Sequence, residues 1–148
     1  MTLKQRIEED IKQAMRDKAQ DRLRALRAIK SLILLEETKG AAIVLTPDDE
    51  IKLLTKAAKQ RKDSAAIYEQ QNRPDLLEKE VAELAVIEAY LPKQLSEEEV
   101  KAKLQAIIDQ VGAKSAAEMG KVMGVAMKEL AGQADGKLVQ TLVKSLLA

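Results

Sequence analysis

Apolar residues recur every three or four positions along seven segments of this chain of 148 residues, a spacing that places them on one face of an α-helix. The first segment follows Thr2, whose hydroxyl suits a helix cap. The second runs from about Asp21 to Thr38, with Gly40 as its predicted stop. We expect residues 40–46, an unusually apolar loop, either to enter the core or to cover a neighbouring surface. The predicted core positions of these helices are Leu3, Ile7, Ile11, Ala14 or Met15, Leu23, Leu26, Ile29, Leu32, Ile33 and Leu35.

The third and fourth segments are predicted to be two further helices. Thr46 and Pro47, followed by acidic residues 48–50, favour a helix start, because a cap, a proline and first-turn acids all act in the same direction. This helix is predicted to reach about Gln70, and residues 72–75 separate it from the next. The predicted buried positions are Ile51, Leu54, Ala58, Ala65, Tyr68, Leu77, Val81, Leu84, Ile87 and Leu91. The four segments together predict an N-terminal bundle of two helical hairpins.

A domain boundary is predicted at Pro92, which cannot continue a helix and disfavours helical dihedrals at the residue before it. Ser96 with Glu99 predicts a capping box, and Ser115 with Glu118 predicts a second. The predicted core positions beyond Pro92, in three helices of which Asp135 caps the last, are Val100, Leu104, Ile107, Ile108, Val111, Met119, Val122, Met123, Ala126, Met127, Leu130, Leu138, Val139, Leu142, Val143 and Leu146. We therefore predict an N-terminal helical domain over residues 1–92 and a small C-terminal three-helix domain over residues 93–148.

The composition favours an all-α fold. Phe and Trp are absent and Tyr occurs twice, so Leu, Ile, Val, Ala and Met must fill the core, which suits helix-on-helix packing. The net charge of +1 argues against a polybasic nucleic-acid-binding protein with a pI above about 9. Any contact with RNA must therefore come from a local patch.

The absent residue types limit the chemistry. The chain has no Cys and no His, which excludes disulfides, thiolate metal sites and an imidazole base, so we expect no cofactor and no metal. No apolar run approaches the roughly 20 residues that cross a bilayer. The first residues are amphipathic and rich in acids, unlike a signal peptide. The expectation is a soluble cytoplasmic protein without a membrane partner.

The segment from Gly120 to Lys137 contains the principal candidate site. Gly120 and Gly124 lie one turn apart, and each costs about 0.8–1 kcal/mol relative to Ala in a helix interior. Close packing against another helix is one interpretation; access of a nucleic-acid phosphate or sugar to the backbone is the other. An ordinary Asp135 cap competes with an anion site at the start of the last helix. The predicted nucleic-acid-binding residues are Lys114, Lys121, Lys128, Gly136 and Lys137.

Two other features have competing interpretations. Basic residues of the second and third helices are either a solvated face or a secondary patch for phosphate or a partner; the patch residues are Arg24, Arg27, Lys30, Lys59, Arg61 and Lys62. Arg16 and Lys18 precede this patch, and the spacing of Lys52, Lys56 and Lys59 places them on one helix face. A methionine stripe at 119, 123 and 127 is either core or an adaptable partner groove.

Catalysis finds little support in these residues. Serine-hydrolase elbows, phosphate-binding loops, zinc-protease helices and amidase-like Ser/Lys arrangements are all absent from the sequence. Acid groups such as residues 36–37 and 97–99 fit helix ends and surfaces better than acid–base catalysis. We predict no catalytic residue and leave enzyme activity open.

Several short motifs in a fixed order resemble the YqeY-like proteins, relatives of the C-terminal part of the GatB subunit of tRNA-dependent amidotransferases. The motifs occupy residues 23–30, 59–64 with Tyr68, 73–76, 79–84, 90–95, 119–123 and 134–137. The resemblance covers nearly the whole chain and implies an N-terminal helical domain followed by a small three-helix domain of the GatB/YqeY type. One departure is Gln133, which stands where the family commonly has a basic residue and weakens the case for phosphate contact at that turn.

The resemblance also implies functions. The similar tail of GatB contacts tRNA, so this chain is expected to be a non-catalytic tRNA-binding or amidotransferase-associated module. A protein-interaction module that docks on an amidotransferase or an aminoacyl-tRNA synthetase is the alternative. The family is also classed with carbon–nitrogen ligases that use glutamine as amide donor, and this activity is the third possibility. The residues leave open which RNA or protein is bound, the oligomeric state and any motion about Pro92.

Overall fold

The structure, a computed structural model, describes residues 1–39 and 44–148. Within these residues every regular element is a helix, which confirms the all-α prediction. None of the described helices is long and apolar enough to cross a membrane. The chain divides into two compact units, Met1–Leu91 and Pro92–Ala148. Each unit has a separate hydrophobic core. The predicted stop at Gly40 lies outside the described residues.

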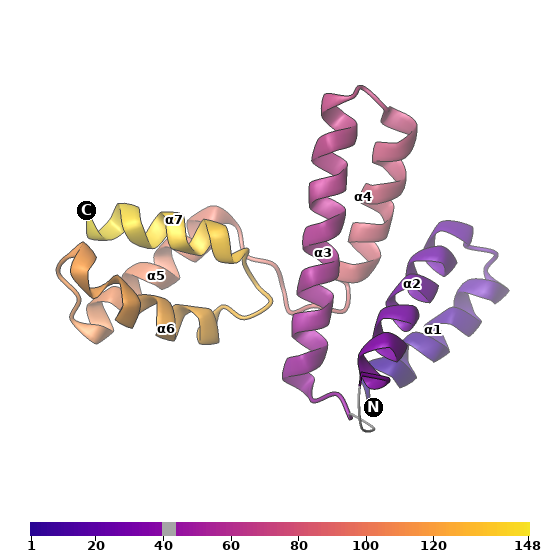
Figure 1. Cartoon of the computed structure of the whole chain (residues 1–148), viewed down its shortest axis with the longest axis horizontal. Coiled ribbons are helices and arrows are strands. Elements are labelled where there is room, and N and C mark those ends of the chain that lie inside the picture. Colours follow the sequence, from indigo (N-terminus) through magenta and orange to yellow (C-terminus); the bar gives the residue numbers. More distant parts are fainter. Residues whose placement is uncertain (40–43) are drawn as a thin grey trace. The chain divides into compact units, whose positions relative to one another are not determined.

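The N-terminal unit consists of four helices, each predicted by the apolar spacing (Figure 1). Their bounds are α1 Leu3–Arg16, α2 Gln20–Glu37, α3 Pro47–Gln70 and α4 Pro74–Glu88. Neighbours in sequence pack as pairs, α1 with α2 and α3 with α4, and α2 also packs on α4. Its core contains Ile7, Leu26, Ile29, Ile33 and Leu54, all at most 2% exposed.

The caps predicted at Thr2 and Thr46 are confirmed by reciprocal hydrogen bonds. Thr2 accepts from the backbone N–H of Gln5, whose side chain accepts in return from the backbone N–H of Thr2. Thr46 and Asp49 make the same exchange at the start of α3. Each box satisfies N–H groups that the first turn of a helix leaves without an intrahelical partner.

Two apolar residues predicted to be buried in this unit are at the surface. Val81 is 51% exposed, because α4 turns Glu80 and Glu83 toward Arg61 of α3, with nitrogen–oxygen distances of 3.2 and 3.1 Å. Leu35 is 57% exposed, because α2 and α3 contact each other only sparsely along their lengths. In both cases the helix was predicted correctly, whereas the width of its buried stripe was not.

The C-terminal unit consists of α5 Glu97–Val111, α6 Met119–Glu129 and α7 Gly136–Leu147, with a short 3₁₀ turn at Ala116–Glu118 before α6 (Figure 1). All three helices contact one another. Their fully buried contacts come from Val100 and Leu104 of α5, Val122 of α6, and Val143 of α7. A small aliphatic core of this kind, without aromatic residues, suits the close approach of three short helices.

The helix starts of this unit differ in one respect from the prediction. Ser96 and Glu99 form the expected capping box, and Asp135 accepts from the backbone N–H of Lys137 at the start of α7. The side chain of Ser115 makes no capping hydrogen bond. Glu118 accepts instead from the backbone N–H of Lys114 at 2.6 Å, so the predicted second capping box is wrong.

Candidate nucleic-acid interface

Helix α6 has one buried face and one face open to solvent. Val122 and Ala126 are 0% exposed and lie one turn apart, so they fix the rotation of the helix about its axis. Gly120, Lys121 and Gly124 consequently face outward and are exposed. The spacing of the core residues therefore determines which side chains α6 presents to a ligand.

A shallow hollow of about 400 Å³ lies over this outer face. Its lining residues are Gly120, Lys121, Gly124, Val125, Lys128 and Glu129. The two glycines lower the floor of the hollow because neither carries a side chain. We call this surface the α6 face.

The glycines of the α6 face do not pack against another helix. A methyl group added at Gly120 or Gly124 would meet no atom within 4 Å outside the helix's own nearby backbone. The close-packing interpretation of this pair is therefore wrong, and the backbone at both positions is accessible from outside. Access of this kind is what contact with a bulky ligand at the helix surface requires.

Two lysines give the α6 face its positive charge. Lys121 and Lys128 are separated by seven positions, which places them on the same side of the helix about 10.5 Å apart along its axis. Within the described residues, neither lysine has a carboxylate oxygen within 4.0 Å. Glu129 lines the same hollow and reduces its positive potential. The arrangement suits two separated phosphates better than a single anion in a closed pocket.

The other predicted binding residues lie outside the lining of this hollow. Lys114 is exposed in the turn after α5, where its backbone N–H is bonded to Glu118. Gly136 begins α7 beside Met127, whose terminal methyl would lie 3.5 Å from an added Cβ. The carboxylate of Asp135 already accepts from the N–H of Lys137, so a negative charge occupies the helix start that an anion would need.

The methionine stripe divides between core and surface. Met119 and Met123 are partly buried and pack against the core of the C-terminal unit. Met127 is 50% exposed, next to the start of α7. The stripe as a whole is therefore not an open apolar groove.

Several residues of the predicted secondary basic patch have carboxylate partners. Arg24 pairs with Asp21 at 3.0 Å, and Lys30 lies 3.6 Å from Glu8. Arg61 joins two carboxylates of α4. Arg27, Lys59 and Lys62 are exposed. The patch residues that pair with carboxylates therefore add little positive electrostatic potential to the surface that a ligand would meet.

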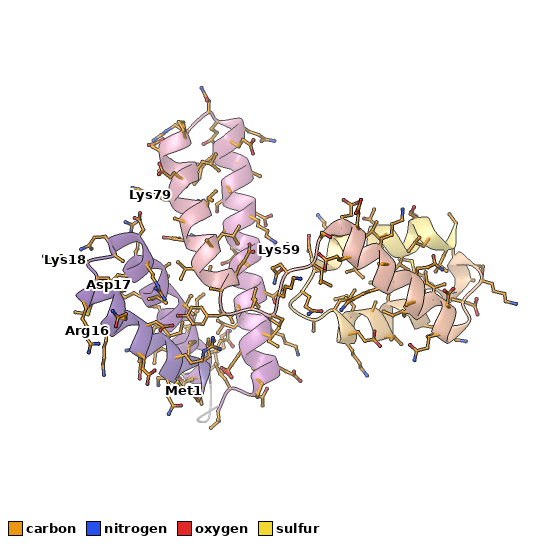
Figure 2. The ribbon with its side chains drawn as sticks, turned by 180° about the vertical axis from the view of Figure 1, so that it is seen from behind. Met1, Arg16, Asp17, Lys18, Lys59 and Lys79 are labelled. Carbon is orange, nitrogen blue, oxygen red and sulfur yellow. The ribbon has the colours of Figure 1, made fainter. Side chains whose placement is uncertain are left out.

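The remaining cations of the N-terminal unit are dispersed. Figure 2 shows Arg16 and Lys18 at the turn between α1 and α2, well separated from Lys59 on α3. Lys79 and Lys59 lie on opposite sides of the hairpin that α3 and α4 form (Figure 2). These positions indicate separate surface charges rather than one continuous patch.

The structure adds two networks that the sequence analysis missed. The amide of Gln94 donates to the carbonyl oxygens of Pro92 and Gly132, and the N–H of Leu95 donates to the carbonyl of Gln133 at 2.9 Å. These bonds fix the loop between α6 and α7. Gln94 belongs to a motif of the YqeY-like proteins, but its spacing of 38 residues from Gly132 carries no sequence signal.

The second network joins Tyr90 to α1. Its hydroxyl donates to Asp10, and the guanidinium carbon of Arg6 lies 5.1 Å from the centre of its ring. Burial and the neighbouring carboxylate of Asp10 raise the pKa of Tyr90. Among the described residues, no three acidic side chains converge as a metal-binding group. The polar clusters of the N-terminal unit therefore have structural explanations.

Comparison with known proteins gives relatives along most of the chain. A protein of Clavispora lusitaniae named "Altered inheritance of mitochondria protein 41, mitochondrial" is 33% identical over 142 residues, covering 93% of this chain and 82% of that protein. A protein of the same name from Pyrenophora tritici-repentis is 30% identical over 149 residues, covering 96% and 79%. One component of a glutamyl-tRNA(Gln) amidotransferase from Thermococcus gammatolerans is 48% identical over 54 residues, which are 34% of this chain and 9% of that protein.

The names of these relatives contradict the cytoplasmic location predicted from the sequence. The proteins of Clavispora lusitaniae, Pyrenophora tritici-repentis and Meyerozyma guilliermondii are each named as mitochondrial. The prediction rested on an amphipathic, acid-rich start and a lack of apolar runs, which are features of the fold rather than of a compartment. The cytoplasmic assignment is therefore wrong.

The family follows from the extent of the match and from the fold. Residues 4–147 match the family described as Yqey-like protein, which includes every helix of both units except the first residue of α1. The proteins of Clavispora lusitaniae and Pyrenophora tritici-repentis match 93% and 96% of the chain at 33% and 30% identity. The chain belongs to the family of Yqey-like proteins.

Proposed function

We propose that this protein is a tRNA-binding module and that the α6 face is its contact surface. The observation that carries the proposal is the outward pair Gly120 and Gly124, unpacked and flanked by Lys121 and Lys128. A nucleic-acid strand lying along α6 would bring one phosphate to each lysine, while the glycines allow its backbone to approach the helix closely.

The chemistry of tRNA suits this surface. Phosphate contacts supply most of the affinity of a weakly basic binding surface and make it sensitive to salt. The α6 face offers two cations and little base-reading chemistry, so it would recognise shape and backbone rather than sequence. The 54-residue similarity to a component of a glutamyl-tRNA(Gln) amidotransferase favours tRNA over other structured RNAs as the ligand.

The test is the binding of the full-length protein to total tRNA at two or more salt concentrations. Replacing Lys121→Glu together with Lys128→Glu should weaken binding and reduce the slope of log affinity against log salt by up to about 1.4–1.8, the value for two lost phosphate contacts. The matched control is Lys101→Glu with Lys103→Glu, which changes the same charge on exposed positions of α5. Unchanged affinity and slope in the α6 variant, or equal losses in the control, would contradict the proposal.

A second candidate function is association with an amidotransferase. The same similarity to a component of a glutamyl-tRNA(Gln) amidotransferase favours it. In this role the protein would bring tRNA to an enzyme that carries the catalytic residues. We expect it to change the rate of glutamine-dependent amidation of misacylated tRNA by such an amidotransferase. Amidation by the purified protein alone would contradict this non-catalytic role. An amidation rate that the protein leaves unchanged would contradict the proposed association with the enzyme.

A further inference from the structure

Helices α2 and α3 leave an open groove between them in the N-terminal unit. Helix α2 packs along α1 and α4, and α3 packs along α4, whereas α2 and α3 contact each other only sparsely. A groove of about 550 Å³, here called the α2–α3 groove, lies in the space that residues 1–39 and 44–148 leave uncovered. Its lining residues are Leu32, Leu35, Glu36, Lys39, Leu45, Asp49, Lys52, Leu53, Lys56, Ala57 and Gln60.

The floor of the groove is apolar. Leu32, Leu45 and Leu53 pack against the core with part of each side chain still uncovered. Leu35 lines the groove and is 57% exposed. The four leucines of the lining together give an apolar surface, and it is a contiguous apolar surface, rather than one exposed leucine, that marks an interaction site.

The groove has the length of a short helix. Its lining residues on α3 run from Asp49 to Gln60, which are eleven positions apart, or about 16 Å at the helical rise of about 1.5 Å per residue. Three turns of an added helix would fit along this distance.

The charges at the rim favour an acidic occupant. Both carboxylates of the lining already have partners, since Glu36 pairs with Lys39 at 2.8 Å and Asp49 caps the start of α3. Lys52 lies close enough to Asp49 to help lower the pKa of that carboxyl group. Within the described residues, neither Lys52 nor Lys56 has a carboxylate oxygen within 4.0 Å. Lys52 and Lys56, one helical turn apart, therefore place two positive charges on the α3 rim, next to the single carboxylate of Asp49.

We propose that the α2–α3 groove binds an amphipathic helix of a partner protein. Apolar residues of that helix, spaced at three, four and seven positions, would contact Leu35 and Leu53, and acidic residues on its flank would pair with Lys52 and Lys56. The apolar floor disfavours helical RNA, because such a helix presents phosphates and 2′-hydroxyl groups at its surface. This site lies in the N-terminal unit and shares no lining residue with the α6 face, which belongs to the C-terminal unit.

The test is selection of a displayed library of helix-forming peptides on the full-length protein, with the Leu35→Glu protein as counter-selection. The enriched sequences should combine the helical apolar spacing with an excess of Asp and Glu. A synthetic peptide of the consensus sequence should bind about tenfold or more weaker to Leu35→Glu and to Lys52→Glu with Lys56→Glu, as expected for central contacts.

Two control proteins match these changes. Leu34→Glu alters a neighbouring leucine that is 42% exposed but does not line the groove. Lys12→Glu with Lys79→Glu alters exposed cations of the same unit outside the groove. Both controls should bind the consensus peptide as the unchanged protein does.

Four results would overturn the proposal. One is no enrichment over the Leu35→Glu protein, and another is enrichment without acidic residues. A third is binding of tRNA that depends on Leu35, which would make RNA the occupant. The last is self-association that Leu35→Glu abolishes in sedimentation experiments, which would make a second copy of this chain the occupant.

Discussion

The hydroxyl of Tyr90 donates a hydrogen bond to the carboxylate of Asp10, a residue 80 positions earlier in the chain. This bond joins the turn after α4 to α1, which otherwise packs chiefly on α2. Arg6 lies over the ring of the same tyrosine, one turn of α1 before Asp10. Tyr90 therefore connects the two ends of the N-terminal unit through both its ring and its hydroxyl.

We expect Tyr90→Phe to lower the free energy of unfolding by roughly 1–2 kcal/mol, because the partly buried carboxylate of Asp10 loses its donor while the ring is retained. Urea denaturation followed by circular dichroism measures the change. Tyr68→Phe is the matched control, since no side-chain hydrogen bond of Tyr68 is present among the described residues. Equal effects of the two substitutions would remove the assigned role of the Asp10 bond.

The raised pKa of Tyr90 predicts an alkaline loss of stability. The folded protein holds the phenolic proton more tightly than the unfolded chain, whose tyrosine has the ordinary value of 10.0. The stabilising contribution is therefore complete below pH 10.0 and decreases as the pH rises above it toward the folded value. In Tyr68→Phe protein, Tyr90 is the remaining tyrosine, so phenolate absorbance should appear at higher pH before unfolding than after it. Coincident titrations of folded and urea-unfolded protein would contradict this assignment.

The helices of this fold were predictable because the signals that start and stop them are local. Ser96 with Glu99 and Ser115 with Glu118 have the same spacing, however, and only the first pair forms a capping box. Glu118 bonds to the backbone of Lys114 instead, within a tight 3₁₀ turn that the residue pattern does not specify. Local signals therefore predicted that a helix begins near residue 116, but not which hydrogen bonds the side chains at its start make.

The candidate site was predictable only in its residue types. The sequence identified Gly120 and Gly124 as unusual but left two explanations open. Packing requires a neighbouring helix against the glycines, whereas ligand access requires open space, and only the tertiary structure distinguishes the two. The exposure of Leu35 and Val81 was missed for the same reason, because helical periodicity identifies a stripe without specifying how many neighbours cover it. The α2–α3 groove lies where few described residues of α2 and α3 contact each other.

We expect Ser96→Ala to destabilise the C-terminal unit by about 1 kcal/mol, because the first turn of α5 loses its side-chain acceptor. Ser115→Ala should be close to neutral, since the side chain of Ser115 makes no capping bond. Thermal denaturation of the two proteins under the same conditions compares them directly. A larger loss in Ser115→Ala than in Ser96→Ala would show that the caps are assigned to the wrong residues.

Because the two units have separate cores, we expect the unfolding of each unit to be measurable with a different spectroscopic probe. Leu104 is 0% exposed in the core of the C-terminal unit, and Leu104→Ala should cost about 2–5 kcal/mol there. Both tyrosines, Tyr68 and Tyr90, lie in the N-terminal unit. We therefore expect Leu104→Ala to shift the unfolding transition seen by circular dichroism while the transition seen by tyrosine fluorescence stays in place. Leu26→Ala, in the other core, should shift the fluorescence transition, and a common shift in both variants would indicate one cooperative unit.

Gly124→Ala should separate stability from binding on the α6 face. The added methyl group meets no atom within 4 Å outside the helix's own nearby backbone, so the substitution should stabilise α6 by about 0.8–1 kcal/mol through helix propensity alone. The same methyl raises the floor of the hollow between Lys121 and Lys128, so affinity for tRNA should fall even though the fold becomes more stable. Gly112→Ala provides the opposite control, because its φ of 71° disfavours any residue with a side chain and the variant should lose stability. A stabilised Gly124→Ala protein with unchanged tRNA affinity would mean that the ligand does not approach the backbone of α6, and the lysines alone would then have to account for binding.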